Sequence, residues 1–229
     1  MNDIRLFLVF GFSVLYTSVV FAQETSLKID SKYLEDQLYF GFSYNSLLNT
    51  PKDFVQNGFS YGTSLGFIKD IPLNKRRNIG LAVGLGYAYN TYNQNLLIQE
   101  LNGVSEYSII ESYSSNRYHT KSVEFPIEFR WRTSSLEKYK FWRVYGGLTF
   151  SYILDFNSKA VIDSKTYIFK NSNDIEKFQY ALSLAAGYGT WNFYVSYALT
   201  SVFKKSVSLK NGQPLDLKNL RLGLMFYMF

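Results

Sequence analysis

The sequence predicts an all-β fold: an eight-stranded antiparallel up-and-down transmembrane β-barrel of the outer-membrane type. Three observations predict it. Eight segments alternate bulky apolar residues with small or polar residues at a period of two, which is the period of a β-strand. Short and long connections alternate between these segments, and Tyr and Trp collect at the segment ends, as in membrane barrels. The chain of 229 residues is long enough for one domain of this kind.

The composition excludes several other classes. Aromatic residues make up 19% of the chain, but the mean hydropathy of -0.11 is too low for a bundle of membrane-spanning helices. The absence of cysteine excludes a disulfide scaffold, a thiolate metal site, a Cys nucleophile and a lipoprotein anchor. The formal charge is +6, yet the basic residues are scattered, and the longest cluster is Lys75-Arg76-Arg77. We therefore expect no nucleic-acid binding.

The first residues predict a secretory signal peptide. Arg5 precedes an apolar run from Leu6 to Ala22, and cleavage after Ala22 would suit a signal peptidase. An uncleaved anchor helix is the alternative, since the run is at the short edge for a membrane span. We expect a signal peptide over residues 1–22, a short periplasmic segment over 23–36 and the barrel over 37–229.

The first three expected strands are residues 38–45, 59–67 and 79–89. Each places mainly Phe, Leu, Tyr or Val on one face and mainly Gly, Ala, Ser or Asn on the other. Gly and Ala are poor candidates for a solvated exterior, but they suit the crowded inside of a narrow barrel. The alternative of a soluble sandwich or lipocalin-like barrel needs a polar outer face, so the pattern disfavours it.

The fourth expected strand, 122–132, reads SVEFPIEFRWR and has an aromatic face and a charged face. With the fifth strand, 142–152, it predicts a lumenal charge network that comprises Glu124, Glu128, Arg130, Arg132 and Arg143. Such charges are tolerable inside a barrel only when they are paired. The network braces the barrel under one interpretation and is a docking or conduction element under the other.

Two further features of the fourth strand bear on its role. Pro126 donates no ladder hydrogen bond, so it predicts a local bulge or a missing bond. Glu124 and Glu128 lie four residues apart on one strand, or roughly 13 Å, which does not favour a glycosidase pair.

The last three expected strands are 178–188, 191–199 and 219–229. The final one leaves two possible lipid-facing sets. Arg221 and Gly223 favour the inside, which turns Leu222 and its neighbours outward, whereas Phe229 as an outward terminal residue favours the opposite set. A bulge would reconcile them. Phe229 is typical of the signal that the barrel insertion machinery reads.

The connections predict the orientation of the barrel. Residues 70–78, 133–140 and 189–190 are short, whereas 49–57, 91–116, 155–177 and 203–218 are longer. An even strand number places both termini on the short-turn side, which is periplasmic in outer-membrane barrels. Possible periplasmic partner contacts are the basic residues of these turns: Lys75, Arg76, Arg77, Lys138 and Lys140.

We expect no catalysis and no cofactor. The single histidine, His119, lies near Ser114, Ser115 and Ser122, a combination found in some lipid A-modifying barrels. His119 and Ser122 differ by three positions, however, and so point to opposite faces of a strand. No zinc spacing, phosphate loop or dinucleotide motif is present.

Several segments together resemble the PorT family, an outer-membrane barrel component of the type IX secretion system in bacteria that often also glide. They include Glu-Phe-Pro (124–126), Phe-Arg-Trp-Arg (129–132), Tyr-Lys-Phe-Trp-Arg (139–143) and Asn-Lys-Arg-Arg-Asn (74–78). The resemblance covers nearly the whole chain after residue 22. It implies a role in protein secretion and in gliding motility, with other type IX secretion components as partners, but no catalytic residues.

The residues by themselves support a narrower conclusion. An eight-stranded barrel has an interior only just wide enough for its side chains, so an accessory subunit is expected rather than a conduit. A generic small barrel that acts in adhesion or envelope integrity through its long surface loops is the alternative. A lipid A-modifying enzyme is the weaker one.

Overall fold

The computed structural model describes residues 36–101, 103–133, 141–170 and 173–228, and the regular structure in these ranges is entirely β. The strands are β1 Asp36–Leu48, β2 Tyr61–Pro72, β3 Ile79–Asn93, β4 Leu96–Leu101, β5 Val104–Ile109, β6 Ser115–Arg132, β7 Trp142–Ile162, β8 Lys165–Lys170, β9 Phe178–Tyr188, β10 Trp191–Ala198 and β11 Lys218–Met228. No helix within the described ranges is long and apolar enough to cross a membrane. The expected signal peptide and most of the segment 23–36 lie outside the described residues.

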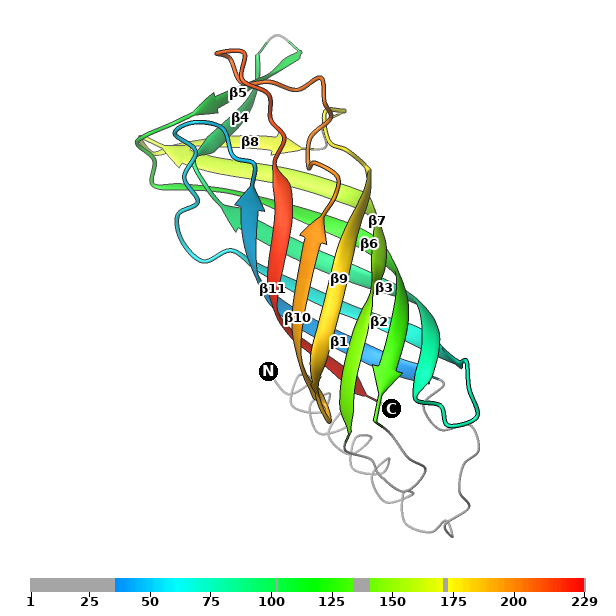
Figure 1. The fold of residues 1–229 in the computed structure, drawn as a ribbon. Helices are drawn as coiled ribbons and strands as arrows, with labels where there is room; N and C mark the ends of the chain where they lie inside the picture. The colour runs from blue at the N-terminus through cyan, green and yellow to red at the C-terminus, as the bar shows by residue number, and fades with distance from the viewer. Residues whose placement is uncertain (1–35, 102, 134–140, 171–172, 229) are drawn as a thin grey trace, which may run out of the picture. The chain divides into compact units, whose positions relative to one another are not determined.

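Eight of these strands close into an antiparallel barrel, which confirms the predicted fold class (Figure 1). Their order is β6-β3-β2-β1-β11-β10-β9-β7, and pairing of β6 with β7 completes the circle. The first and last strands pair along Leu38↔Met228 to Leu48↔Lys218. Closure matters because lipid offers no water to unpaired backbone groups at a sheet edge.

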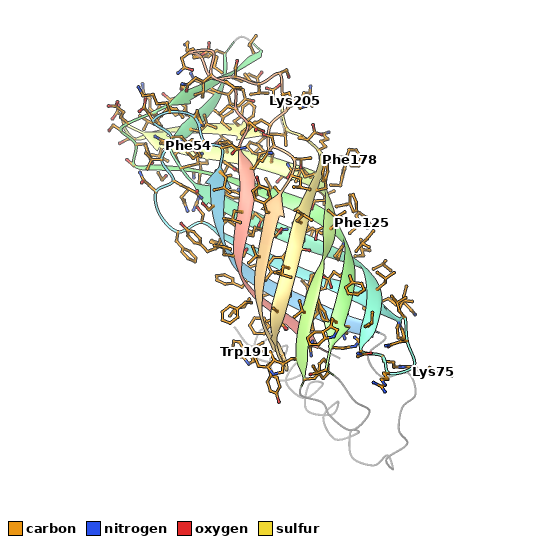
Figure 2. All side chains as sticks on the ribbon, viewed as in Figure 1. Phe54, Lys75, Phe125, Phe178, Trp191 and Lys205 are labelled. Carbon is orange, nitrogen blue, oxygen red and sulfur yellow. The ribbon has the colours of Figure 1, made fainter. Side chains whose placement is uncertain are left out.

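The barrel exterior is apolar and its lumen is polar or small. Outward side chains such as Leu85, Phe129 and Phe193 are 55%, 51% and 77% exposed, whereas Ala82 and Asn192 face inward and are fully buried. Side chains stand out from the barrel wall on all the strands in view, Phe125 and Phe178 among them (Figure 2). A soluble barrel would have the reverse arrangement, so the soluble alternative is wrong.

Aromatic residues mark the short-turn end of the outer wall. Trp131, Trp142, Tyr188 and Trp191 are 42–65% exposed there, and Trp142 packs against Tyr188 with ring centroids 5.5 Å apart. Such amphipathic rings suit the interface between hydrocarbon and headgroups.

Only one of the two alternating sets of side chains on the last strand, β11, faces outward. The registers of β11 with β1 and with β10 run without a shift, so no bulge reconciles the two sequence patterns. Leu222 and Met228 are each 44% exposed, whereas Met225 and Tyr227 are buried. The set containing Leu222 therefore faces lipid, and Phe229 lies outside the described residues.

Pro126 interrupts the sheet without bending its register. The pairing of β3 with β6 runs to Val83↔Ile127 and resumes at Gly86↔Glu124 in the same register. Of the two predicted possibilities, the structure has the missing pairing at Pro126. A true register shift occurs nearby, between Lys121 and Ser122, where β6 faces β7.

The long connections are folded rather than simple loops, which differs from the sequence prediction for 91–116 and 155–177. β6 and β7 have 18 and 21 residues, about twice what a membrane-spanning strand needs. β8 pairs with the upper part of β7, and β4 pairs with β5. Periodicity alone did not reveal these extensions because their faces mix polar and apolar residues.

The folded connections share a hydrophobic core at the long-loop end, which we call the cap core. Its members are buried residues from several strands and loops: Leu47, Tyr92, Leu96, Ile98, Tyr107, Tyr118, Ile153, Phe156, Phe169, Ile175, Val202, Phe203, Val207, Leu209, Leu215 and Leu217. Burial on this scale stabilises the loops, since each large apolar side chain contributes about 1.5–3 kcal/mol.

Candidate functional site

The charged residues of β6 project into the lumen. Strand alternation turns Glu124, Glu128, Arg130 and Arg132 inward together, and each is less than 9% exposed. Arg143 of β7 is buried beside them. The lumen is therefore the candidate functional site, and its partners decide what it can do.

Glu124 forms an ion pair across the barrel. Arg221 of β11 donates from Nη1 to Glu124 Oε1 at 2.8 Å and from Nη2 to Ser196 Oγ at 3.3 Å. β11 lies four strands from β6 in either direction around the barrel, so the pair spans the lumen. This pair ties opposite walls together.

Glu128 forms an ion pair within its own strand. Arg130 donates from Nε and Nη2 to Glu128 Oε2, both at 3.0 Å, and from Nη1 to Gln37 Oε1 at 3.0 Å. The guanidinium also lies 4.4 Å from the ring centroid of Tyr145 and 5.2 Å from that of Tyr227. A planar, weakly hydrated cation suits this aromatic surrounding better than an ammonium group would.

Arg132 links the lumen to the turn between β2 and β3. It forms an ion pair with Asp70, and both side chains are at most 1% exposed. Its Nε donates to the backbone oxygen of Arg77 at 2.6 Å. The charged layer is thus anchored to the turn in which Arg77 has a left-handed φ of 54°.

Arg143 does not pair with Glu124 or Glu128, so that part of the predicted network is wrong. No ion pair of Arg143 occurs among the described residues, and its Nε and Nη1 lack hydrogen-bond partners there. Its guanidinium instead lies 4.6 Å from the ring centroid of Phe141 and 5.8 Å from those of Tyr145 and Tyr227. The carboxylates are already paired with arginines that reach them more directly.

The lumen has little free space. The cavity between the Glu124–Arg221 pair and the cap core measures about 30 Å³, which has room for only a few water molecules. Below it, inward side chains pack together, including Tyr39, Ile68, Tyr194 and Met225. The arrangement is a braced interior rather than a channel.

The basic turn lies at the short-turn end of the barrel, where Figure 2 places Lys75. Lys75 and Arg76 are exposed, and Arg77 N donates to Asn74 O at 3.0 Å within the turn. Lys138 and Lys140 lie outside the described residues.

His119 and Ser122 face opposite sides of the barrel wall. Ser122 is 2% exposed and lines the lumen cavity, whereas His119 faces outward above the apolar band. Partial burial lowers the pKa of the His119 imidazole below its ordinary value, which the nearby Asp155 carboxylate partly offsets. The two side chains cannot form a catalytic dyad. Among the described residues, no group of three His, Asp or Glu side chains could hold a metal ion.

Sequence reasoning missed three members of the lumenal site. Asp70 was assigned to a short connection, and Gln37 lies at the predicted start of the barrel. Arg221 was placed inside, but no local pattern connects it with Glu124, which is 97 positions away. The strand count could have indicated this pair, since in a closed eight-stranded barrel the fourth strand, which carries Glu124, faces the eighth, which carries Arg221.

Comparison with known proteins supports the location of this barrel. A family model described as "Outer membrane protein beta-barrel domain" matches residues 21–204, which is most of the chain, and no curated protein matches the sequence. The match ends before β11, the strand that closes the barrel in the structure. Its apolar exterior, polar lumen and closed sheet are those of an outer-membrane protein, and the chain belongs to the outer-membrane protein β-barrel domain family.

Proposed function

We propose that this protein is an accessory outer-membrane subunit of type IX secretion, as its resemblance to the PorT family implies, with gliding motility affected where adhesins are the cargo. The observation that carries the accessory role is the filled lumen. Buried ion pairs and aromatic side chains occupy it, and the cap core covers its long-loop end. A folded cargo protein has no path through such a barrel.

We propose that the short turns and both termini lie in the periplasm, as in other outer-membrane barrels. Lys75 and Arg76 then face periplasmic components, and Arg132 holds their turn in place through Arg77. Cationic side chains on a fixed turn suit an acidic protein surface.

Deletion of the gene tests the secretion role. Secretion of cargo carrying the C-terminal type IX signal should be lost while the other outer-membrane components remain correctly localised. Normal secretion in the deletion strain would refute the proposal.

Charge reversal at the turn tests the contact surface. A Lys75→Glu/Arg76→Glu variant should insert normally but fail to restore secretion. The matched control is Lys204→Glu/Lys205→Glu, which reverses two exposed charges in the segment that follows β10, and it should restore secretion. Equal rescue by both variants would exclude the basic turn as a contact.

Adhesion through the loops is the second candidate, and the folded cap favours it. A groove of about 570 Å³ lies among the β4–β5 hairpin, β8 and residues 206–208. If the protein acts in adhesion, replacement of the β4–β5 hairpin by a short turn should abolish adhesion and leave secretion intact. If it acts in secretion, the same replacement should not affect adhesion.

We further propose that the protein is not an enzyme, which the separation of His119 from Ser122 supports. If it were a lipid A-modifying enzyme, His119→Ala would abolish a mass change in lipid A. We expect the lipid A mass spectrum to be the same with wild type, His119→Ala and the deletion strain.

A further inference from the structure

Cations gather on the outer wall of the barrel, directly above the apolar band. On β6 the outward residues change from Val123 to Lys121, His119 and Arg117 toward the long-loop end, and Lys159 of β7 and Lys170 of β8 lie on the same face. We call Arg117, Lys121, Lys159 and Lys170 the basic rim. The lumen, the basic turn and the cap core do not involve these residues.

The basic rim contains a like-charge pair that the protein does not neutralise. Arg117 and Lys159 are direct cross-strand partners, and both are exposed. Like charges in this position destabilise a sheet. Asp155 is the nearby carboxylate, but it lies 3.3 Å from Lys121 and 4.0 Å from His119. Within the described residues Arg117, Lys159 and Lys170 form no ion pair, so the rim is set up for an external anion.

The basic rim borders a groove of about 620 Å³ that contains no carboxylate. Arg117, Lys159 and Lys170 line one part of the groove, and Phe59, Tyr61 and Tyr89 line the other. The aromatic side is continuous, with centroid distances of 6.1 Å from Phe59 to Tyr61 and 6.4 Å from Tyr61 to Tyr89.

The groove matches the chemistry of an amphiphile at a membrane interface. Aromatic rings favour the headgroup level, and the exposed apolar wall below Lys121 offers a surface to acyl chains. Arg and Lys on adjacent strands can bridge one phosphate, since cross-strand Cβ atoms are about 5 Å apart.

We propose that this groove binds the phosphorylated headgroup of an outer-leaflet glycolipid, with the acyl chains along the outer wall. The long-loop end faces the cell surface in this arrangement, so the rim lies at the level of the outer leaflet. The site depends on membership of the outer-membrane family and not on the secretion role.

The test uses the full barrel purified in detergent and lipid A as the probe. Arg117→Gln/Lys159→Gln should lower the affinity for lipid A by about tenfold or more, because two charge-assisted contacts are lost. The matched control, Lys165→Gln/Lys204→Gln, removes the same charge outside the groove and should leave the affinity unchanged. Dephosphorylated lipid A should bind weakly to all three proteins, and lipid A should be recovered with unchanged mass.

Four results would overturn the proposal: equal affinity for lipid A and its dephosphorylated form, an equal loss in the control variant, equally tight binding of inorganic phosphate, or equally tight binding of phosphatidylglycerol. The thermal unfolding midpoint in lipid-free detergent provides a separate readout. Arg117→Gln should leave it unchanged or raise it, because the opposed like charges are relieved. A lowered midpoint would make Arg117 a structural residue and would also overturn the proposal.

Discussion

The buried charged residues of the lumen differ in whether a counter-charge lies beside them. A buried charge is strongly unfavourable unless a counter-charge and hydrogen bonds compensate it. Arg221 and Glu124 satisfy this condition with each other, at 2.8 Å, on opposite walls. Arg143, in contrast, lies close to aromatic rings and forms no ion pair with any carboxylate of the described residues.

Removal of the Arg221 side-chain charge should destabilise the barrel strongly. Arg221→Met leaves Glu124 buried without its partner, so we expect the free energy of unfolding to fall by about 3–5 kcal/mol. Urea unfolding of the refolded barrel, followed by Trp fluorescence, measures this. Glu124→Gln in the same chain should restore part of the loss. A loss below about 1 kcal/mol would show that the Glu124–Arg221 pair does not brace the barrel.

Removal of the Arg143 charge should be milder. Arg143→Met deletes cation–π contacts worth about 0.5–2 kcal/mol, but among the described residues it leaves no carboxylate unpaired. The same urea experiment should therefore rank Arg143→Met clearly below Arg221→Met. The reverse ranking would restore the sequence prediction that Arg143 neutralises a lumenal carboxylate.

At the scale of elements, small residues on β2 and β3 admit a large residue from β1. Tyr39 is buried, and its ring lies against Gly66 and Gly86. A Cβ added at Gly66 would lie 2.5 Å from the Tyr39 Cζ, and one at Gly86 would overlap the Tyr39 hydroxyl. The alternation of Gly with apolar residues in β3 thus creates space for a neighbouring strand's side chain.

Gly86→Ala should therefore destabilise the barrel by about 1–3 kcal/mol through overpacking. The matched control is Gly146→Ala on the outer face, where a Cβ would meet nothing closer than Leu184 Cδ1 at 3.6 Å, and it should change stability by less than about 0.5 kcal/mol. Tyr39→Phe combined with Gly86→Ala should recover part of the loss, because it removes the overlapping hydroxyl. Equal effects of the two Ala substitutions would contradict this packing.

At the scale of the whole barrel, the lumenal ion pairs, the packed inward side chains and the cap core together block an open passage. The cavity beside the Glu124–Arg221 pair measures about 30 Å³, and the cap core lies at the long-loop end. The outer wall and the ends of the barrel are consequently the surfaces available to partners.

The barrel should not form a porin-like channel. In planar lipid bilayers, inserted protein should show no steady ohmic conductance, because the Glu124–Arg221 pair and the packed aromatics cross the lumen. Insertion is verified by the heat-dependent electrophoretic shift of a folded barrel. A steady open channel in the wild type would contradict the filled lumen and with it the accessory role.

The eight barrel strands and the outward faces of all but the last were predictable, because a period of two can be recognised from neighbouring residues alone. Pairs such as Phe125 with Glu124 already show which side of the wall is apolar. The charge partners were not predictable in the same way. The sequence placed Arg143 in one network with Glu124 and Glu128, but the partner of Glu124 is Arg221 on the opposite wall.

The long connections show the same limit. Residues 91–116 and 155–177 have mixed polar and apolar sequences, and their strands contribute Tyr107 and Phe169 to the cap core, where Phe203 from a third segment is also buried. Their structure depends on segments that are distant in sequence.

The sequence by itself determined the class of the protein, the eight strands of its barrel and, for every strand but the last, the side that meets lipid, because alternation and closure follow from local pattern and strand count. Only the tertiary structure decided which charges pair, how the loops fold and where cations meet on the outer wall. Those features depend on the register and order of strands around the barrel, which bring together residues such as Glu124 and Arg221, or Arg117 and Lys159, that no local pattern connects.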